Sequence, residues 1–340
     1  MSPLWPGSHS FLGTAIENYL QSRQRLGYVT QSAKSYLRDL DHYLVFHDII
    51  SIRKIDESLV IHWMHSIPSR SNRTKNSMLL CLRKFLDFLI RQGLMVNNPA
   101  RGVAYLKFKP FKPYLYAIKE IQQLLLAAQK RERSSRQRQG FAWRTMATMI
   151  YLIYACGLRL SEALNLRIED VDLSQNTLSL WKTKFHKERL VPFSDAAHHR
   201  LKEYLSLRLK RYPPTNSPEA APFLCHSKGK YGAVCIGSFF RKLLADCRIA
   251  NPAGHSPRIH DLRHTFACHL LYKWYQEGRD PLNKLPWLAT YMGHVNIQST
   301  QVYLTITRAL LREGDRRFRD QFENIPAGFL KKAISKACHP

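Results

Sequence analysis

The stretch "HDLRHTFACHLL", residues 260–271, joins a polar start to a long apolar run, as expected where a buried helix begins. His260 and Arg263 are three residues apart, so their side chains share one helical face near the first turn. Helix N-termini bind phosphate through free N–H groups and the helix dipole. A phosphate site and an ordinary capping or core histidine both fit this stretch alone. His264 points away from that face and is interpreted as structural.

Two other stretches supply cations. In "GLRLSEALNL", residues 157–166, Arg159 lies between leucines after an apolar helix, and a buried guanidinium needs an anion. Glu162 is three residues away, so an internal ion pair is the simpler interpretation. In "TLSLWKTKFHKERLVPF", residues 177–193, two alternating apolar runs flank a lysine-rich turn, which predicts a β-hairpin with Lys184 and Lys187 at its tip.

The fourth stretch is "MGHVNIQSTQVYL", residues 292–304, in which Tyr303 follows His294 by nine residues. Since a helix is predicted to start near Ser299, Tyr303 taken alone would be a core aromatic. The four stretches together are more informative than any one of them. Two arginines can bind the oxygens of a phosphodiester, histidine and lysine can move protons, and tyrosine can act as a covalent nucleophile.

Other chemistries lack their motifs. The sequence shows no acidic cluster spaced for Mg²⁺, no P-loop, and no His/Cys set with zinc spacing. We therefore expect no metal and no other cofactor. Cationic side chains would then neutralise the phosphate during the reaction.

The charge balance indicates a polyanionic partner. The chain of 340 residues has 52 Lys+Arg against 25 Asp+Glu, a net charge of +27 spread over both its parts. Such a field attracts DNA or RNA. The seven cysteines are scattered without a C-x-x-C pair, which favours a reducing cytoplasm. The longest uncharged stretch, residues 145–158, is too short to span a bilayer, so no membrane association is expected.

Hydrophobic periodicity predicts two mainly helical parts. The first hundred residues show four helices, at 11–26, 35–46, 57–66 and 77–93. A basic, proline-containing stretch at 97–114 predicts an extended linker. The second part shows helices at 118–130, 142–156, 195–211, 237–249, 260–275 and 299–312. The charged run 129–140 is interpreted as a solvated loop, with phosphate contact as the alternative.

In order and wording, the four stretches resemble the motifs of the tyrosine recombinase (phage integrase) family, as in Xer recombinases and lambda integrase. The resemblance covers about residues 10–312. It implies a mainly α fold with a small β-sheet or hairpin. A four-helix, SAM-like core-binding domain would occupy 1–105, a basic linker 106–116, and the catalytic domain with a C-terminal tail 117–340. The two domains would close as a clamp around DNA.

The resemblance also implies a nucleophile and a phosphate clamp. Tyr303 would attack the scissile phosphate and form a 3′-phosphotyrosyl link, releasing a 5′-hydroxyl. Arg159 and Arg263 would hold the phosphate and its developing charge. Glu162 matches the acidic residue of the family and would orient the arginine. Ion pairing and catalysis are then compatible roles for Arg159.

The remaining roles concern protons. By the same resemblance, His260 would assist proton transfer at Tyr303, Lys184 would protonate the leaving 5′-oxygen, and His294 would donate a hydrogen bond to the phosphate. The hairpin tip lacks the glycines usual in the family, so Lys182 or Lys187 competes with Lys184 for the role of general acid.

The function implied is site-specific integration of a mobile element, without ATP, on double-stranded DNA. Four protomers would join two DNA sites, with accessory DNA-bending proteins or a sister recombinase as further partners. The alternatives are an Xer-like resolvase of chromosome or plasmid dimers, a catalytically inactive DNA-binding member of the fold, and a relaxing topoisomerase. An unusually long stretch at 272–287 and the intact motif set favour an active integrase.

Overall fold

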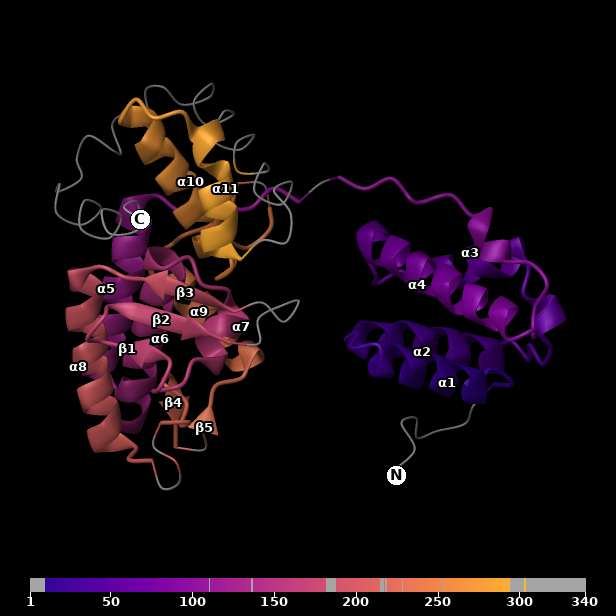
Figure 1. Cartoon of the computed structure of the whole chain (residues 1–340), viewed down its shortest axis with the longest axis horizontal. Helices are drawn as coiled ribbons and strands as arrows, with labels where there is room; N and C mark the ends of the chain where they lie inside the picture. Colours follow the sequence, from indigo (N-terminus) through magenta and orange to yellow (C-terminus); the bar gives the residue numbers. More distant parts are fainter. Residues whose placement is uncertain are drawn as a thin grey trace. The chain divides into compact units, whose positions relative to one another are not determined.

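The computed structural model of the chain describes residues 10–109, 111–135, 137–181, 188–214, 217, 219–227, 229–252, 254–293 and 303. The chain divides into two compact units, Met1–Phe111 and Lys112–Pro340. Figure 1 shows the helices and strands of each unit, and each unit has its own hydrophobic core. The predicted fold class, mainly helical with a small β-sheet, is confirmed.

The first unit contains the four predicted helices. They are α1 (Gly13–Arg25), α2 (Gln31–Phe46), α3 (Glu57–His65) and α4 (Asn72–Arg91), with short 3₁₀ turns at Ile52–Lys54 and Pro99–Arg101. Asp56 and Ser71 cap α3 and α4 by accepting backbone N–H bonds. Gly27 and Gly93, both with positive φ, follow α1 and α4.

The prediction of an extended linker is wrong for its first part. Ala100 and Val103 are buried in the core of the first unit. The Asn76 side chain exchanges hydrogen bonds with both main-chain groups of Leu106, at 2.8 and 2.9 Å. The chain is held against α4 as far as residue 107, because amide side chains on α4 make hydrogen bonds with the main chain of this segment.

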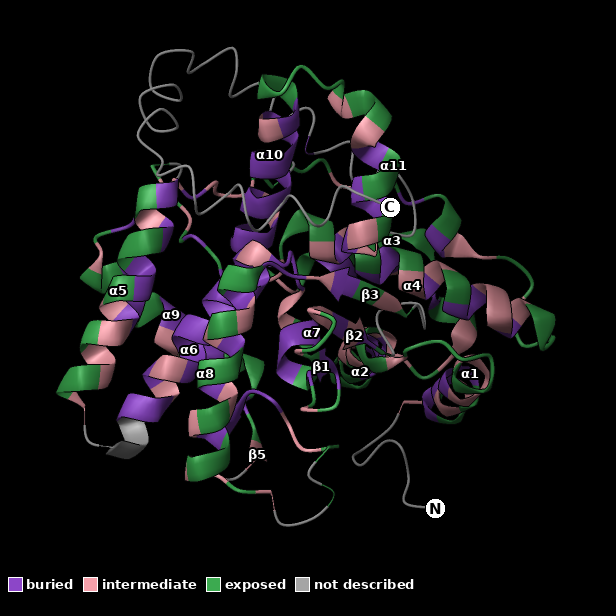
Figure 2. Cartoon of the chain, turned by 60° about the vertical axis from the view of Figure 1, so that its left-hand side comes forward, coloured by how far each residue is buried: buried purple, intermediate pink, exposed green. Residues whose placement is uncertain are grey.

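The second unit is built around α6 (Gln137–Ala155), which is buried along most of its length (Figure 2). From Thr145 onward this helix has no charged residue, and it needs apolar neighbours on several sides. Helices α5, α7, α8, α9 and α10 supply them. Their bounds are Ile118–Ser134, Leu160–Asn165, Asp195–Arg211, Ala233–Asp246 and Asp261–Gln276, and α11 follows at Pro281–Met292.

A three-stranded antiparallel sheet runs in the order β1 (Val171–Asp172), β2 (Thr177–Leu180) and β3 (Arg189–Pro192). Strands β2 and β3 form the predicted hairpin, with Leu180 opposite Arg189 as its last pair. The predicted tip, residues 182–187, lies outside the described residues. Strands β4 (Cys225–His226) and β5 (Gly229–Lys230) form a second, two-stranded sheet that the sequence did not predict.

One prediction about a charged segment is wrong. The run 129–140 is mostly helical, because Arg131 pairs with Asp246, and Glu132 pairs with Arg144 at 2.5 Å. Asp246 lies on α9 and Arg144 on α6, so these ion pairs stabilise the C-terminal end of α5 against both helices. The stretch 272–287 contains the last turns of α10 and the start of α11, with Leu285 buried. Of the predicted helix 299–312, only Tyr303 is described, and it is helical.

Within the described residues, no helix is long and apolar enough to cross a membrane.

Candidate active site

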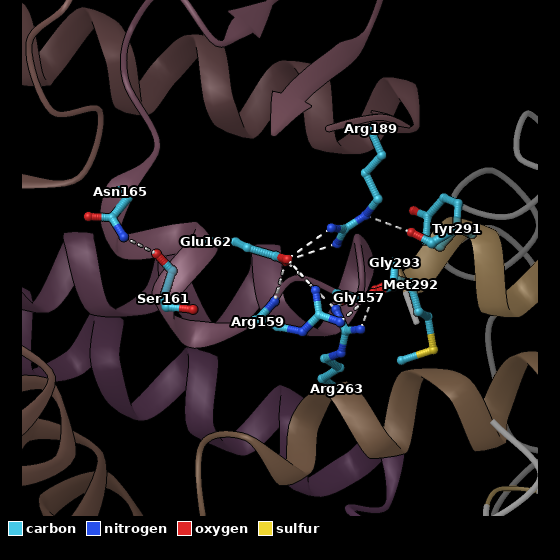
Figure 3. Close-up of polar contacts among 10 residues, drawn as sticks. All are labelled: Gly157, Arg159, Ser161, Glu162, Asn165, Arg189, Arg263, Tyr291, Met292 and Gly293. Carbon is cyan, nitrogen blue, oxygen red and sulfur yellow. Dashed lines mark hydrogen bonds and ion pairs between the residues drawn. The ribbon is translucent and has the colours of Figure 1, made fainter. Parts of the chain in front are cut away.

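Glu162, on α7, is the centre of a buried ion cluster (Figure 3). Only 5% of its side chain is exposed, and three guanidinium groups surround it. They come from the N-terminus of α7, from β3 and from α10. Segments far apart in the sequence therefore meet at one carboxylate.

Arg159 is the N-cap residue of α7. Its backbone N–H donates to Glu162 Oε2 at 2.8 Å, and its Nη1 donates to Oε1 at 2.6 Å. The ion pair expected from the sequence is thus present. Its Nη2 donates to the carbonyl of Gly293 at 2.6 Å, and 19% of the side chain remains exposed.

Arg263, on α10, is almost completely buried. Its Nη1 donates to the carbonyl of Gly157 and its Nη2 to the carbonyl of Met292, and Nη1 lies 3.7 Å from Glu162 Oε2. Burial, followed by the charge of Arg159, lowers the pKa of Arg263 to about 10. The guanidinium therefore stays charged at neutral pH, as a phosphate ligand must.

Arg189, the first residue of β3, is a member of the cluster that the sequence analysis missed. Its Nη1 and Nη2 bind both oxygens of Glu162, at 2.8 and 2.9 Å. Its Nε donates to the carbonyl of Tyr291 at 2.9 Å. The available signal was a charged residue at the start of an apolar strand, directly after the lysine-rich turn.

The C-terminal end of α11 holds all three arginines. The carbonyls of Tyr291, Met292 and Gly293 are consecutive, and they accept bonds from Arg189, Arg263 and Arg159 respectively (Figure 3). The last carbonyls of a helix have no partner within it and form the negative end of its dipole. These carbonyls are suited to hold cations, and each of them accepts a hydrogen bond from one arginine.

The cluster has a net of two positive charges. Burial alone would raise the pKa of Glu162, but the hydrogen bond and charge of Arg189, with help from Arg159 and Arg263, lower it to about 2. The carboxylate is therefore ionised at neutral pH, and one negative charge faces three guanidinium groups. Such a site can stabilise the extra negative charge of a phosphoryl transition state.

Tyr303 is buried beside this cluster, with 3% of its surface exposed. Burial raises its pKa to about 12, although the charges of Arg263 and Arg159 lower it and Arg263 also hydrogen-bonds the phenol. The hydroxyl is therefore protonated at neutral pH. The structure thus brings together four of the predicted site residues: Arg159, Glu162, Arg263 and Tyr303.

The histidine in contact with Tyr303 is His264, whose Nδ1 lies 3.2 Å from the tyrosine hydroxyl. The interpretation of His264 as pointing away is wrong, because Tyr303 lies on the side of α10 that His264 faces. The ring of His260 packs edge-on against His264, 5.0 Å between centroids. Burial and the charge of Arg263 lower the pKa of His260 to about 4. Lys184 and His294, also predicted as site residues, lie outside the described residues.

Replacing Gly293 by alanine should disrupt the cluster. Gly293 has φ +63°, and an added Cβ would lie 2.8 Å from Arg189 Nη1. We expect about 3 kcal/mol of destabilisation, from left-handed backbone strain and overpacking together. The measurement is denaturant unfolding. Gly278→Ala is the matched control: φ is +72° there and nothing lies within 4 Å, so only about 1 kcal/mol should be lost. Equal losses in both variants would contradict the packing argument.

Family models and known proteins match most of the chain. The model of the phage integrase family matches residues 117–309, and that of the phage integrase N-terminal SAM-like domain matches residues 16–93. A Sinorhizobium fredii protein that carries the name integrase/recombinase is 31% identical, over 91% of this chain and 98% of its own. Tyrosine recombinase XerD of Oceanobacillus iheyensis is 28% identical, over 88% of this chain and 96% of its own.

Solved structures share the fold. A lambda integrase dimer bound to a COC′ core site matches 84% of this chain and 96% of its own, at 13% identity and a TM-score of 0.61. The Tn1549 transposon integrase with a circular intermediate DNA matches 87% and 95%, at 18% identity and a TM-score of 0.64. XerH bound to a palindromic difH substrate matches 89% and 84%, at 19% identity and a TM-score of 0.65.

Proposed function

Because the chain belongs to the phage integrase family and is a tyrosine recombinase, a DNA strand-exchange enzyme, we propose that it is the site-specific integrase of a mobile element. The single observation that carries the chemistry is the buried Tyr303 beside the cluster of Glu162 and its arginines. The mobile-element role is supported by the relative named integrase/recombinase, which aligns over nearly the whole of both chains.

In the proposed reaction, the phenol oxygen of Tyr303 attacks the scissile phosphorus of double-stranded DNA. A Tyr303–phosphorus bond forms, the bond to the 5′-oxygen breaks, and a 3′-phosphotyrosyl link remains. Arg159 and Arg263 bind the non-bridging oxygens and stabilise the added charge. Glu162 orients both arginines. The link keeps the energy of the phosphodiester, so rejoining needs no ATP.

The proposed reaction also needs a proton to leave Tyr303 and a proton to reach the 5′-oxygen. His260 assists removal of the Tyr303 proton, with His264 lying between the two as the imidazole in contact with the phenol. Lys184 donates a proton to the leaving 5′-oxygen, and His294 donates a hydrogen bond to the phosphate. A phenol with a pKa of about 12 is a weak nucleophile at neutral pH, so cleavage depends on this help.

We propose that the domains 1–105 and 117–340 close around duplex DNA, connected by the linker 106–116. Four protomers join two sites, with two tyrosines active at a time. Accessory DNA-bending proteins or a sister recombinase assist, and the reaction takes place in the cytoplasm. The basic charge of the chain, +27 overall, supports the DNA partner.

The second candidate function is an Xer-like resolvase of chromosome or plasmid dimers. The observation in its favour is the similarity to XerD, which spans most of both chains. The two functions use the same chemistry and differ in the DNA site.

Covalent trapping on genomic DNA of the source organism distinguishes them. The protein is incubated with fragmented DNA, stopped with SDS, and the DNA ends attached to it are sequenced. An integrase should be trapped at the ends of a mobile element, including the copy that carries its own gene. A single chromosomal site, with no element at its flanks, would favour the resolvase and contradict our proposal.

The general acid is tested with a bridging 5′-phosphorothiolate at the scissile position. A thiol has a pKa near 8.5, whereas the 5′-alcohol resembles water, near 15.7, so only the alcohol needs a proton to leave. Lys184→Ala should slow cleavage of ordinary DNA by roughly 10²- to 10⁴-fold and cleave the phosphorothiolate like wild type. Lys187→Ala is the matched control. If it alone shows this pattern, Lys187 is the general acid.

A further inference from the structure

We propose that Arg189 is a positioning residue of the phosphate site: it neutralises Glu162, so that Arg159 and Arg263 direct their charge toward the scissile phosphate. This inference rests on the proposed function of those two arginines. Neither the motif comparison nor the family assignment gives Arg189 a role.

Arg189 binds Glu162 more completely than the other two arginines do. Arg189 makes a bidentate contact with both carboxylate oxygens, at 2.8 and 2.9 Å, the arrangement in which guanidinium and carboxylate fit best. Arg159 contacts only one oxygen with its side chain, and Arg263 lies 3.7 Å away. The carboxylate is therefore paired most completely with the arginine that we do not expect to bind phosphate.

Arg189 also sets the net charge of the cluster. With Arg189 present, one carboxylate and three guanidinium groups leave two net positive charges. Without Arg189 only one remains, and the buried carboxylate must draw on Arg159 and Arg263 for its compensation. A phosphodiester gains a negative charge at the transition state. Halving the net charge of the site therefore weakens transition-state stabilisation more than it weakens binding of the duplex.

Arg189 connects three elements of the site. Its Nε bond to Tyr291 ties β3 to the end of α11, and its Nη bonds tie β3 to Glu162 on α7. The next two carbonyls of that helix end hold Arg263 and Arg159. Arg189 thus fixes the anion and the carbonyls that together orient the phosphate-binding pair.

The test compares an ordinary duplex with one that carries an uncharged methylphosphonate at the scissile position. The neutral group needs less cationic stabilisation. A variant that lacks positive charge at the site should therefore lose less of its cleavage rate on the methylphosphonate than on ordinary DNA. We expect Arg189→Met to cleave ordinary DNA roughly 10²-fold more slowly than wild type, with duplex affinity within a few-fold. On the methylphosphonate the difference should fall below tenfold, in single-turnover cleavage.

Arg144→Met is the matched control. Arg144 also pairs with two carboxylates, Glu132 and Glu203, but on α5 and α8. Any slowing in this variant should be the same on both substrates. Arg189→Lys keeps the charge and loses the bidentate fork, so its defect should be smaller than that of Arg189→Met. If circular dichroism shows that Arg189→Met does not fold, the uncharged variant Arg189→Gln is compared on the two substrates instead.

An equal defect of the Arg189 variant on both substrates, or wild-type cleavage of ordinary DNA, would overturn the inference. Arg159→Ala separates this from failure of the proposed function. If Arg159→Ala recovers on the methylphosphonate and Arg189→Met does not, only the role of Arg189 is wrong. If Arg159→Ala cleaves ordinary DNA like wild type, the phosphate clamp itself is wrong, and the inference is overturned with it.

Discussion

Replacement of Tyr303 by phenylalanine should abolish the covalent protein–DNA adduct, a loss of roughly 10⁴-fold or more, because the phenol oxygen is the atom that forms the bond to phosphorus. Phenylalanine fills the same buried space. It removes the hydrogen bonds of the hydroxyl, including that with His264, so we expect only about 1 kcal/mol of lost stability from that contact. The measurement is the SDS-stable adduct on a nicked duplex carrying the recombination site.

Tyr154→Phe is the control for this variant. Tyr154 is a second buried tyrosine whose hydroxyl contacts a histidine, His269 Nδ1 at 2.9 Å. The Tyr154→Phe variant loses the same kind of hydrogen bond in the same unit of the chain, but it does not lose an atom that takes part in the reaction. Tyr154→Phe should form the adduct at close to the wild-type level. If Tyr303→Phe forms it equally well, Tyr303 is not the nucleophile.

The second large effect is expected for Arg159→Ala. The side chain contributes one of the two net positive charges of the cluster and is more exposed than Arg189 or Arg263. Removing a preorganised cation that stabilises the transition state should slow cleavage by roughly 10³-fold. Duplex affinity should fall much less, because a chain with a net charge of +27 keeps most of its attraction for the DNA backbone when one arginine is lost. Single-turnover cleavage and equilibrium binding at one salt concentration measure the two effects.

Arg167→Ala serves as its control, since Arg167 makes an exposed ion pair with Glu169 close by in the sequence. Exposed pairs contribute little to stability. We expect cleavage within a few-fold of wild type for this variant. A parallel loss of affinity and rate in Arg159→Ala would mean that the residue only holds DNA, which contradicts its proposed role in the transition state.

The sequence predicted those parts of the fold that depend on local pattern. Helix α8 spans Asp195–Arg211 as predicted, and strands β2 and β3 form the predicted hairpin. Apolar spacing and turn residues determine such elements directly. The run 129–140 was misassigned because its charges find partners outside the run, 12 residues away on α6 and 115 residues away on α9. Those partners have no signal in the local pattern.

In the site, too, the sequence predicted contacts between residues close in the chain and missed those between distant residues. The pair of Arg159 and Glu162 is local, three residues apart, and the structure contains it. Arg189 was missed because its partner is 27 residues away. The carbonyls at the end of α11 were missed because main-chain groups carry no residue-specific signal. His264 was misjudged, although it is four residues from His260 and this spacing places both side chains on one face of α10, where His264 contacts Tyr303.

The identity of the residue linked to DNA tests the account most directly. The adduct is formed on a nicked duplex and digested with nuclease and protease, and tandem mass spectrometry locates the remaining nucleotide. We predict one modified peptide, in which a nucleotide is joined through its 3′-phosphate to the phenol oxygen of Tyr303. A nucleotide on any other tyrosine, or on a serine, cysteine or histidine, would contradict the proposed mechanism.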